Sequence, residues 1–283
     1  MCLIFSYVDL GSQEHFKVLF DEYHTRVKVS IYEEFLSELQ DKGYDTEPLK
    51  ERIDSSLLSK ENFDVYVVVT PIKMYTDEEL EAIEHFVEEG GGLIILGDGG
   101  YWMQKDRITG PINAISTIFG IEFNEDEVQD FENIVEGGNH LDVIISTFKN
   151  HPVTRDVEGI GYLYGCSLTL GPSVTGLAFG DTSTTADKKK GRDVIVLAAT
   201  EYGKGKVLAM GDYDFLITTI YNTLPSPLYF MDDRVLGFNM FEWVTYLPES
   251  TPPESTPPED GGICMGTMFL GGMFVGLIPR RKA

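Results

Sequence analysis

The sequence predicts an α/β fold, a flavodoxin-like three-layer sandwich in which a mainly parallel sheet lies between two layers of helices. Two segments, DVYVVVTP at 64–71 and GLIILGD at 92–98, are apolar at nearly every position, as is typical of strands covered on both faces. The segment between them has its apolar residues at helical spacing. This strand–helix–strand order favours parallel strands.

The elements before residue 64 fit the same plan. KVLFDEYH at 17–24 predicts a first strand that ends in polar residues. A helix with apolar positions from Ile31 to Leu39 follows, and Gly43 stands where a helix commonly ends. YDTEPL at 44–49 predicts a short edge strand, because its proline lacks the N–H that an inner strand donates.

The helix between the two apolar segments begins at a clear signal. Thr76 is followed three residues later by Glu79, the pair that forms a capping box at a helix N-terminus. Residues 111–119 predict a further helix that ends before Gly120. After this glycine, short apolar segments separated by glycines predict a β-rich insertion.

The C-terminal part of the body adds a hairpin and a helix. DVIVLAATEYGKGKVLAMGDYDFL at 193–216 predicts two antiparallel strands at the edge of the sheet. Residues 234–246 predict the last helix, with Val235, Phe238, Phe241 and Trp243 on its apolar side. The body that these elements form is assigned to residues 17–247.

The two ends of the chain differ from this body. Residues 1–16 are either an additional strand or the remnant of a signal peptide. Residues 248–262, rich in Pro, Glu, Ser and Thr, predict an extended stalk. Residues 263–279 carry no charge and precede Arg280, Arg281 and Lys282. We therefore expect 263–283 to anchor the chain in a membrane, with the basic end in the cytoplasm and the body outside the cell.

The charge of the chain excludes one class of partner. Its 283 residues contain 22 Lys and Arg against 46 Asp and Glu, a formal net charge of −24. Nucleic-acid binding depends on cations that displace the counterions of the phosphate backbone. We therefore expect no nucleic-acid partner, and expect a small molecule or a surface protein instead.

Polar side chains follow three of the predicted strands. The carboxyl ends of parallel strands meet at one edge of a sheet, where α/β proteins commonly bind ligands. The candidate ligand-binding residues at these strand ends are Asp21, His24, Asp98, Gly99, Gly100, Tyr101, Asp212 and Asp214.

These residue types leave several chemistries open. Carboxylates with an imidazole can bind a divalent metal ion or act as general acid and base. Aspartates also cap helices and fix turns without any functional role. The sequence therefore assigns no cofactor and no catalytic residue, with a divalent metal ion as an open alternative.

The body resembles the class I glutamine amidotransferase-like superfamily, and within it a prokaryotic branch related to the GIFT domain of intraflagellar-transport proteins. The motifs that carry the resemblance are VLFDEYH (18–24), YTDEELEAIEHFVEEGGGLIILGD (75–98), NHPVT (150–154) and GKGKVLAMGDYDFL (203–216). In active members the turn after the central strand is Gly-x-Cys-x-Gly. Here it reads Gly97-Asp98-Gly99-Gly100, so the resemblance implies the fold without a cysteine nucleophile.

The tail resembles a second group of proteins. Cys264, the apolar segment after it and the basic end are similar to the Cys-Gly-Pro-type sorting tails of archaeal surface proteins, although Met265 and Gly266 stand where Gly-Pro would be. This resemblance implies display on the surface of an archaeal cell.

Three functions are compatible with these observations. The first is a non-catalytic domain that binds a ligand or a protein at the cell surface. The second is a metal-assisted hydrolase that uses the strand-end carboxylates. The third, implied by the proteins that accompany the amidotransferase-like branch, is an accessory subunit of a transporter.

Overall fold

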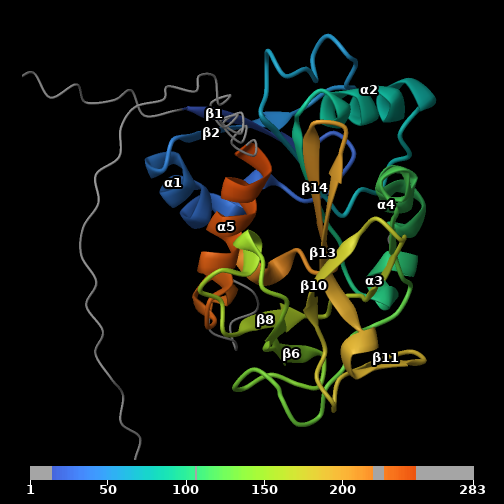
Figure 1. Cartoon of the computed structure of the whole chain (residues 1–283), viewed down its shortest axis with the longest axis vertical. Helices are drawn as coiled ribbons and strands as arrows, with labels where there is room; N and C mark the ends of the chain where they lie inside the picture. The colour runs from blue at the N-terminus through green and yellow to red at the C-terminus, as the bar shows by residue number, and fades with distance from the viewer. Residues whose placement is uncertain (1–14, 106, 219–225, 247–283) are drawn as a thin grey trace, which may run out of the picture. The chain divides into compact units, whose positions relative to one another are not determined.

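The computed structural model of this chain describes residues 15–105, 107–218 and 226–246 (Figure 1). The predicted segment at 1–16 lies almost wholly outside these residues, and the stalk at 248–262 and the anchor at 263–283 lie entirely outside them. No helix in the described ranges is long and apolar enough to span a membrane. The anchor, the cytoplasmic end and the surface location therefore stay predictions.

The centre of the fold is a layer of five parallel strands. They are β2 (Tyr44–Leu49), β1 (Phe16–Asp21), β3 (Val65–Val69), β4 (Gly92–Leu96) and β14 (Gly205–Met210), in that spatial order. This is the 2-1-3-4-5 order of flavodoxin-like sheets. All residues of β3 and β4 are buried, which explains why their sequences are apolar without alternation.

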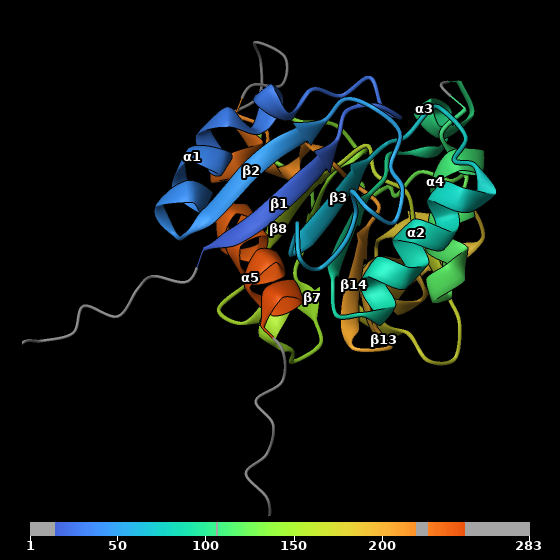
Figure 2. The same ribbon diagram turned by 90° about the horizontal axis from the view of Figure 1, so that it is seen from above.

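Helices cover both faces of this layer (Figure 2). α1 (Glu33–Asp41) and α5 (Asp233–Thr245) pack on one face with Val67 and Ile94, while α2 (Asp77–Glu88) and α4 (Thr109–Ser116) pack on the other with Val68 and Ile95. Adjacent strand residues thus contribute to opposite halves of the core. The predicted three-layer arrangement with a mostly parallel central sheet is confirmed.

The predicted start of α2 is also confirmed. The Thr76 hydroxyl accepts a hydrogen bond from the Glu79 N–H at 3.3 Å, and the Glu79 carboxylate accepts one from the Thr76 N–H at 2.9 Å. Both contacts satisfy N–H groups that have no partner inside the helix. The second oxygen of Glu79 has another contact, described below.

The predicted hairpin is present, but its position in the sheet was predicted wrongly. β13 (Ile195–Tyr202) pairs antiparallel with β14 (Figure 1). β14 also pairs in parallel with β4. β14 is therefore an inner strand, and all six of its residues are buried. The glycine-rich turn identified the hairpin correctly, but only the long-range pairing with β4 decides that it is internal.

The rest of the sheet is antiparallel. β13 connects the parallel layer to the β-rich insertion, whose strands in the described residues are β5 (Ile121–Phe123), β6 (Asp142–Ile145), β7 (Thr147–Phe148), β8 (Ile160–Leu163), β9 (Leu168–Leu170), β10 (Thr175–Phe179), β11 (Thr185–Ala186) and β12 (Lys189–Lys190).

Two helical details differ from the prediction. A short helix, α3 (Gly100–Lys105), follows the turn after β4, where no helix was predicted. In α5 the buried side includes Leu236, Met240 and Phe241, whereas Val235 is exposed. The predicted Phe241 is buried and the predicted Phe238 and Trp243 pack partly buried against the core, so of the four predicted residues only Val235 was placed wrongly.

Candidate functional site

The strand ends form two separate clusters at the carboxyl edge of the sheet. Asp21 is the last residue of β1, Asp98 lies just beyond β4, and Asp212 lies just beyond β14. Asp21 and His24 form one cluster. Asp98, Asp212 and Asp214 form the other, in which they influence one another electrostatically.

The first cluster is a closed polar network. The Oδ2 of Asp21 accepts hydrogen bonds from the Tyr66 hydroxyl at 2.7 Å and the Tyr75 hydroxyl at 2.6 Å, and it lies 2.8 Å from Nδ1 of His24. Nε2 of His24 lies 3.2 Å from Oε1 of Glu79, at ion-pair distance but without hydrogen-bond geometry. All five side chains are buried.

The electrostatics of this network favour an ionised Asp21. Burial by itself raises the pKa of this carboxyl, but the hydrogen bonds and charge of His24 and the Tyr75 hydroxyl outweigh it, so the pKa lies below its ordinary value. A buried carboxylate with three side-chain partners is a structural element that holds β1, β3 and α2 together. It offers no open coordination or proton-transfer position to a ligand.

The network also lies where flavodoxin-like folds commonly bind ligands. The connections after β1 and β3 leave toward opposite faces, which makes this the switch point of the topology. Here the chain closes the crevice itself. Thr25 forms a β-bridge with Pro71, and the Thr25 hydroxyl donates to the Thr70 carbonyl at 3.3 Å. Thr70 has φ 38°, a strained conformation for a β-branched residue.

In the second cluster, buried aspartates bind the backbone. Oδ2 of Asp212 accepts the Leu163 N–H at 2.8 Å, and Oδ1 accepts the Asp214 N–H at 2.6 Å. Burial raises the pKa of Asp212 to about 7 despite these two hydrogen bonds. Burial and the neighbouring Asp212 and Asp98 raise the pKa of Asp214 well above its ordinary value. These groups therefore favour the neutral form on folding.

This shift predicts a pH-dependent stability. As the pH rises from about 4 to about 7, folded Asp212 holds a proton that the unfolded chain has released, so the free energy of unfolding falls across this window. We expect a higher midpoint of thermal unfolding at pH 5 than at pH 8, and a smaller difference in Asp212→Asn. Calorimetry at both pH values measures it. Asp187→Asn, at an exposed position, should retain the full difference, and an unchanged difference in Asp212→Asn would contradict the assignment.

The turn after β4 is covered by the insertion. Gly99 and Gly100 are buried. A Cβ atom at Gly99 would lie 2.0 Å from the carbonyl oxygen of Tyr164, and one at Gly100 would lie 2.7 Å from that of Glu125. Both glycines are thus required by close backbone packing. Contact between this turn and a ligand would require the cover to move.

No cysteine takes the place of the missing nucleophile in the described residues. Cys166 is fully buried, and burial together with Asp126 and Asp98 raises its pKa well above the ordinary value. A thiol in such an environment stays protonated and inert. His151, at the start of a 3₁₀ turn, accepts the Val153 N–H through Nδ1 at 3.2 Å and packs edge-on against Trp243, which is the geometry of a turn-fixing residue.

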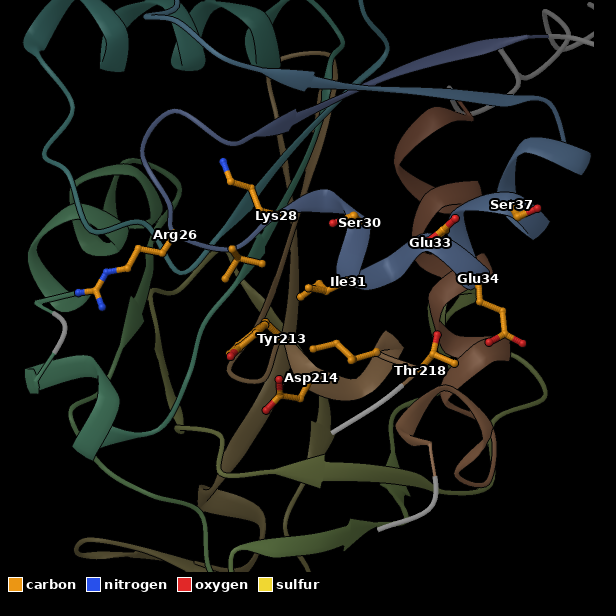
Figure 3. A pocket seen from close by; sticks show the side chains of 12 residues that line it. Arg26, Lys28, Ser30, Ile31, Glu33, Glu34, Ser37, Tyr213, Asp214 and Thr218 are labelled. Atoms are coloured by element: carbon orange, nitrogen blue, oxygen red, sulfur yellow. The ribbon is translucent and has the colours of Figure 1, made fainter. Parts of the chain in front are cut away.

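An open pocket lies beside these clusters, on the α1 side of the carboxyl edge. Its volume is about 940 Å³. Figure 3 shows its lining from the β1–α1 connection, the first turns of α1 and the segment after β14. The charged and hydroxyl side chains among these residues are Arg26, Lys28, Ser30, Glu33, Glu34, Ser37, Tyr213, Asp214 and Thr218.

Of the residues predicted from the sequence, Asp214 alone lines this pocket. Tyr101 is exposed on α3, with the Lys105 ammonium over its ring at 5.3 Å. The pocket residues before α1 were not predicted because the prediction considered polar residues directly at the strand ends. The sequence feature that indicates them is the loop at 26–30, which follows the first parallel strand and must therefore lie at the ligand-binding edge.

The described residues contain no group of three or more His, Cys, Asp or Glu side chains arranged to hold a metal ion. In the second cluster, two oxygens of Asp212 are already occupied by backbone N–H groups. Binding of a divalent metal ion therefore stays an untested alternative.

Comparison with known proteins gives a family and several relatives. The family model described as "ABC-type uncharacterized transport system" matches residues 17–209. An uncharacterized protein of Aquifex aeolicus (strain VF5) is 34% identical over 118 residues, which are 40% of this chain and 48% of that protein. The TRPM8 channel-associated factor homolog of Xenopus laevis is 34% identical over 98 residues, 30% of this chain and 10% of that protein. The match thus spans about half of the first relative and a tenth of the second.

Among solved structures, the mmIFT52 N-terminal domain is similar to this chain with a TM-score of 0.67 and 17% sequence identity, over 81% of this chain and 97% of that domain. At this identity the likeness concerns the fold alone.

Proposed function

The chain belongs to the family described as an ABC-type uncharacterized transport system, and we propose that it is a non-catalytic accessory component of such a system that binds a solute. Membership of a transport family supports a role in handling a transported molecule. The observation that carries the proposal is the contrast between two places at the carboxyl edge. The turn after β4 is covered and lacks a nucleophile, whereas the pocket beside α1 is open.

The composition of the pocket supports binding rather than catalysis. Its lining offers hydroxyl groups, charges of both signs and apolar surface from Ile31 and Ile217. A nucleophile needs a base within hydrogen-bonding distance, and among the described residues no side-chain hydrogen bond joins the hydroxyl of Ser30 or Ser37 to a carboxylate or an amine of the lining. Pockets of this size commonly hold small organic ligands through a few polar groups on an apolar lining.

We expect a solute to raise the midpoint of thermal unfolding of the full chain, and above its dissociation constant the stabilisation should grow with the logarithm of the solute concentration. At a hundred times its dissociation constant, a ligand stabilises the native state by about 2.7 kcal/mol, equivalent to roughly 5–10 °C for a domain of this size. A panel of amino acids, peptides, sugars, nucleotides and divalent metal ions would be screened in this way. Mass spectrometry should recover the bound solute unchanged.

A pair of variants assigns the binding to the pocket. Ser30→Trp fills the pocket from an exposed position and should abolish the shift. Ser55→Trp, exposed but outside the pocket lining, should retain it. A shift that survives Ser30→Trp, the absence of any shift, or chemical conversion of the solute would each refute the proposed function.

The proposal also includes a location. The uncharged segment at 263–279 and the basic residues after it support an anchor that displays the body outside the cell membrane. Digestion of the body by protease added to intact cells tests this location, and full protection of the body would contradict it.

A further inference from the structure

The pocket beside α1 carries opposite charges on its two sides. Figure 3 shows Arg26 and Lys28 on one side and Glu33 and Glu34 on the other, with Ile31, Tyr213 and Asp214 between them. The basic residues belong to the β1–α1 connection, and the acidic pair forms the first turn of α1. The backbone therefore places the basic and the acidic residues on opposite sides of the pocket.

Arg26 already has an interaction of its own, so the charged groups considered for a ligand are Lys28 on the basic side and Glu33 and Glu34 on the acidic side. The Lys28 ammonium lies 3.4 Å from Glu22, but its side chain is 60% exposed, and an ion pair of this kind is weak. Glu33 is exposed, and its carboxylate has no hydrogen bond or ion pair with another described residue. Glu34 accepts the Tyr229 hydroxyl through Oε1, which leaves its second oxygen available.

The middle of the pocket is less polar than its sides. Val27, Ile31 and Ile217 line it together with the Tyr213 side chain. The volume of about 940 Å³ lies near the upper end of the range for small-molecule sites, roughly 300–1,000 Å³. A ligand that fits this arrangement is several residues long, apolar in the middle and oppositely charged at its ends.

Other solute classes match the lining less well. A nucleotide would bring several negative charges to a pocket that already holds the carboxylates of Glu33 and Glu34, inside a chain of net charge −24. A neutral sugar would leave the charges of both sides uncompensated when it displaces their water, which costs free energy. A simple amine would use the acidic side alone.

We propose that this pocket binds short zwitterionic peptides, with the peptide carboxylate toward Lys28 and the peptide ammonium toward Glu33 and Glu34. This inference rests on the proposed function and names its solute class. The apolar lining then contacts the central side chain. The shared chemistry of peptide ends and backbone allows many sequences to bind.

The probes are the tripeptide Ala-Val-Ala and its N-acetylated and C-amidated forms, and isothermal titration of the full chain gives their affinities. We expect each modification to weaken binding about tenfold. Glu33→Gln should weaken the free peptide about tenfold and remove most of the effect of acetylation. Lys28→Met should likewise weaken binding of the free peptide about tenfold and remove most of the effect of amidation. Glu61→Gln, exposed and outside the pocket lining, should bind all three peptides as the unaltered chain does.

Failure of this inference differs from failure of the proposed function. Equal binding of the three peptides, or no binding of any of them, would overturn the zwitterion assignment. If another solute then binds and Ser30→Trp abolishes its binding, the proposed function stands with a different solute class. If no solute responds to Ser30→Trp, both fail.

Discussion

Gly99→Ala is expected to lower the free energy of unfolding by at least about 3 kcal/mol, because the new methyl group meets backbone rather than a movable side chain. Its position would be 2.0 Å from the Tyr164 carbonyl oxygen and 3.0 Å from the carbon of the same group. The insertion would have to lift from the turn after β4. That movement would also disturb the neighbouring contact between Gly100 and Glu125.

Urea unfolding of the two chains measures this change, with Gly110→Ala as the matched control. Gly110 is exposed near the start of α4, and a Cβ atom there would meet its nearest neighbour at 3.5 Å, an ordinary contact. Alanine is also the better helix former, so the control should be neutral or slightly more stable. Equal urea midpoints for the two variants would show that the insertion can move away from the turn after β4 at little cost in free energy.

Asp21→Ala is expected to cost about 3–5 kcal/mol of unfolding free energy. The change removes the acceptor of two tyrosine hydroxyls and the partner of His24 in one step. It also removes the acceptor of the backbone N–H groups of Tyr23 and His24. Buried donors that lose their acceptor keep the cost of their desolvation.

Two further variants make this result specific. Asp21→Asn keeps the shape of the side chain and should fall between Asp21→Ala and the unaltered chain. Asp45→Ala breaks the ion pair with His15, whose side chains are both more than half exposed, and should leave the urea midpoint unchanged. If Asp21→Ala were no less stable than Asp45→Ala, the polar network would contribute nothing to the fold.

The parallel core could be predicted from the sequence because its signals are local. The apolar runs that became β3 and β4, the capping pair Thr76 and Glu79, and the glycine after α1 each act within a few residues. The strand order needed one more fact, the pairing of β14 with β4. The local sequence of a strand does not indicate which other strand pairs with it in the sheet.

The candidate site was only partly predictable for the same reason. Strand ends placed Asp21, Asp98 and Asp212 correctly at the carboxyl edge, yet burial divides them between two clusters that bind backbone and hydroxyl groups. Which side of an edge is open depends on where the insertion packs. The contact of Tyr164 with the turn after β4 joins residues far apart in the chain, and no sequence pattern in either segment predicts it.

The inner position of β14 has a consequence for synthesis of the chain. β4 ends at Leu96, and its partner on that side, β14, begins at Gly205. Until the ribosome has released residues 205–210, the apolar strand β4 has one row of backbone groups without a partner in the sheet. Such an open edge can pair with other chains, and contacts between distant segments form slowly. The nascent protein therefore passes through its most aggregation-sensitive stage while the whole insertion is being made.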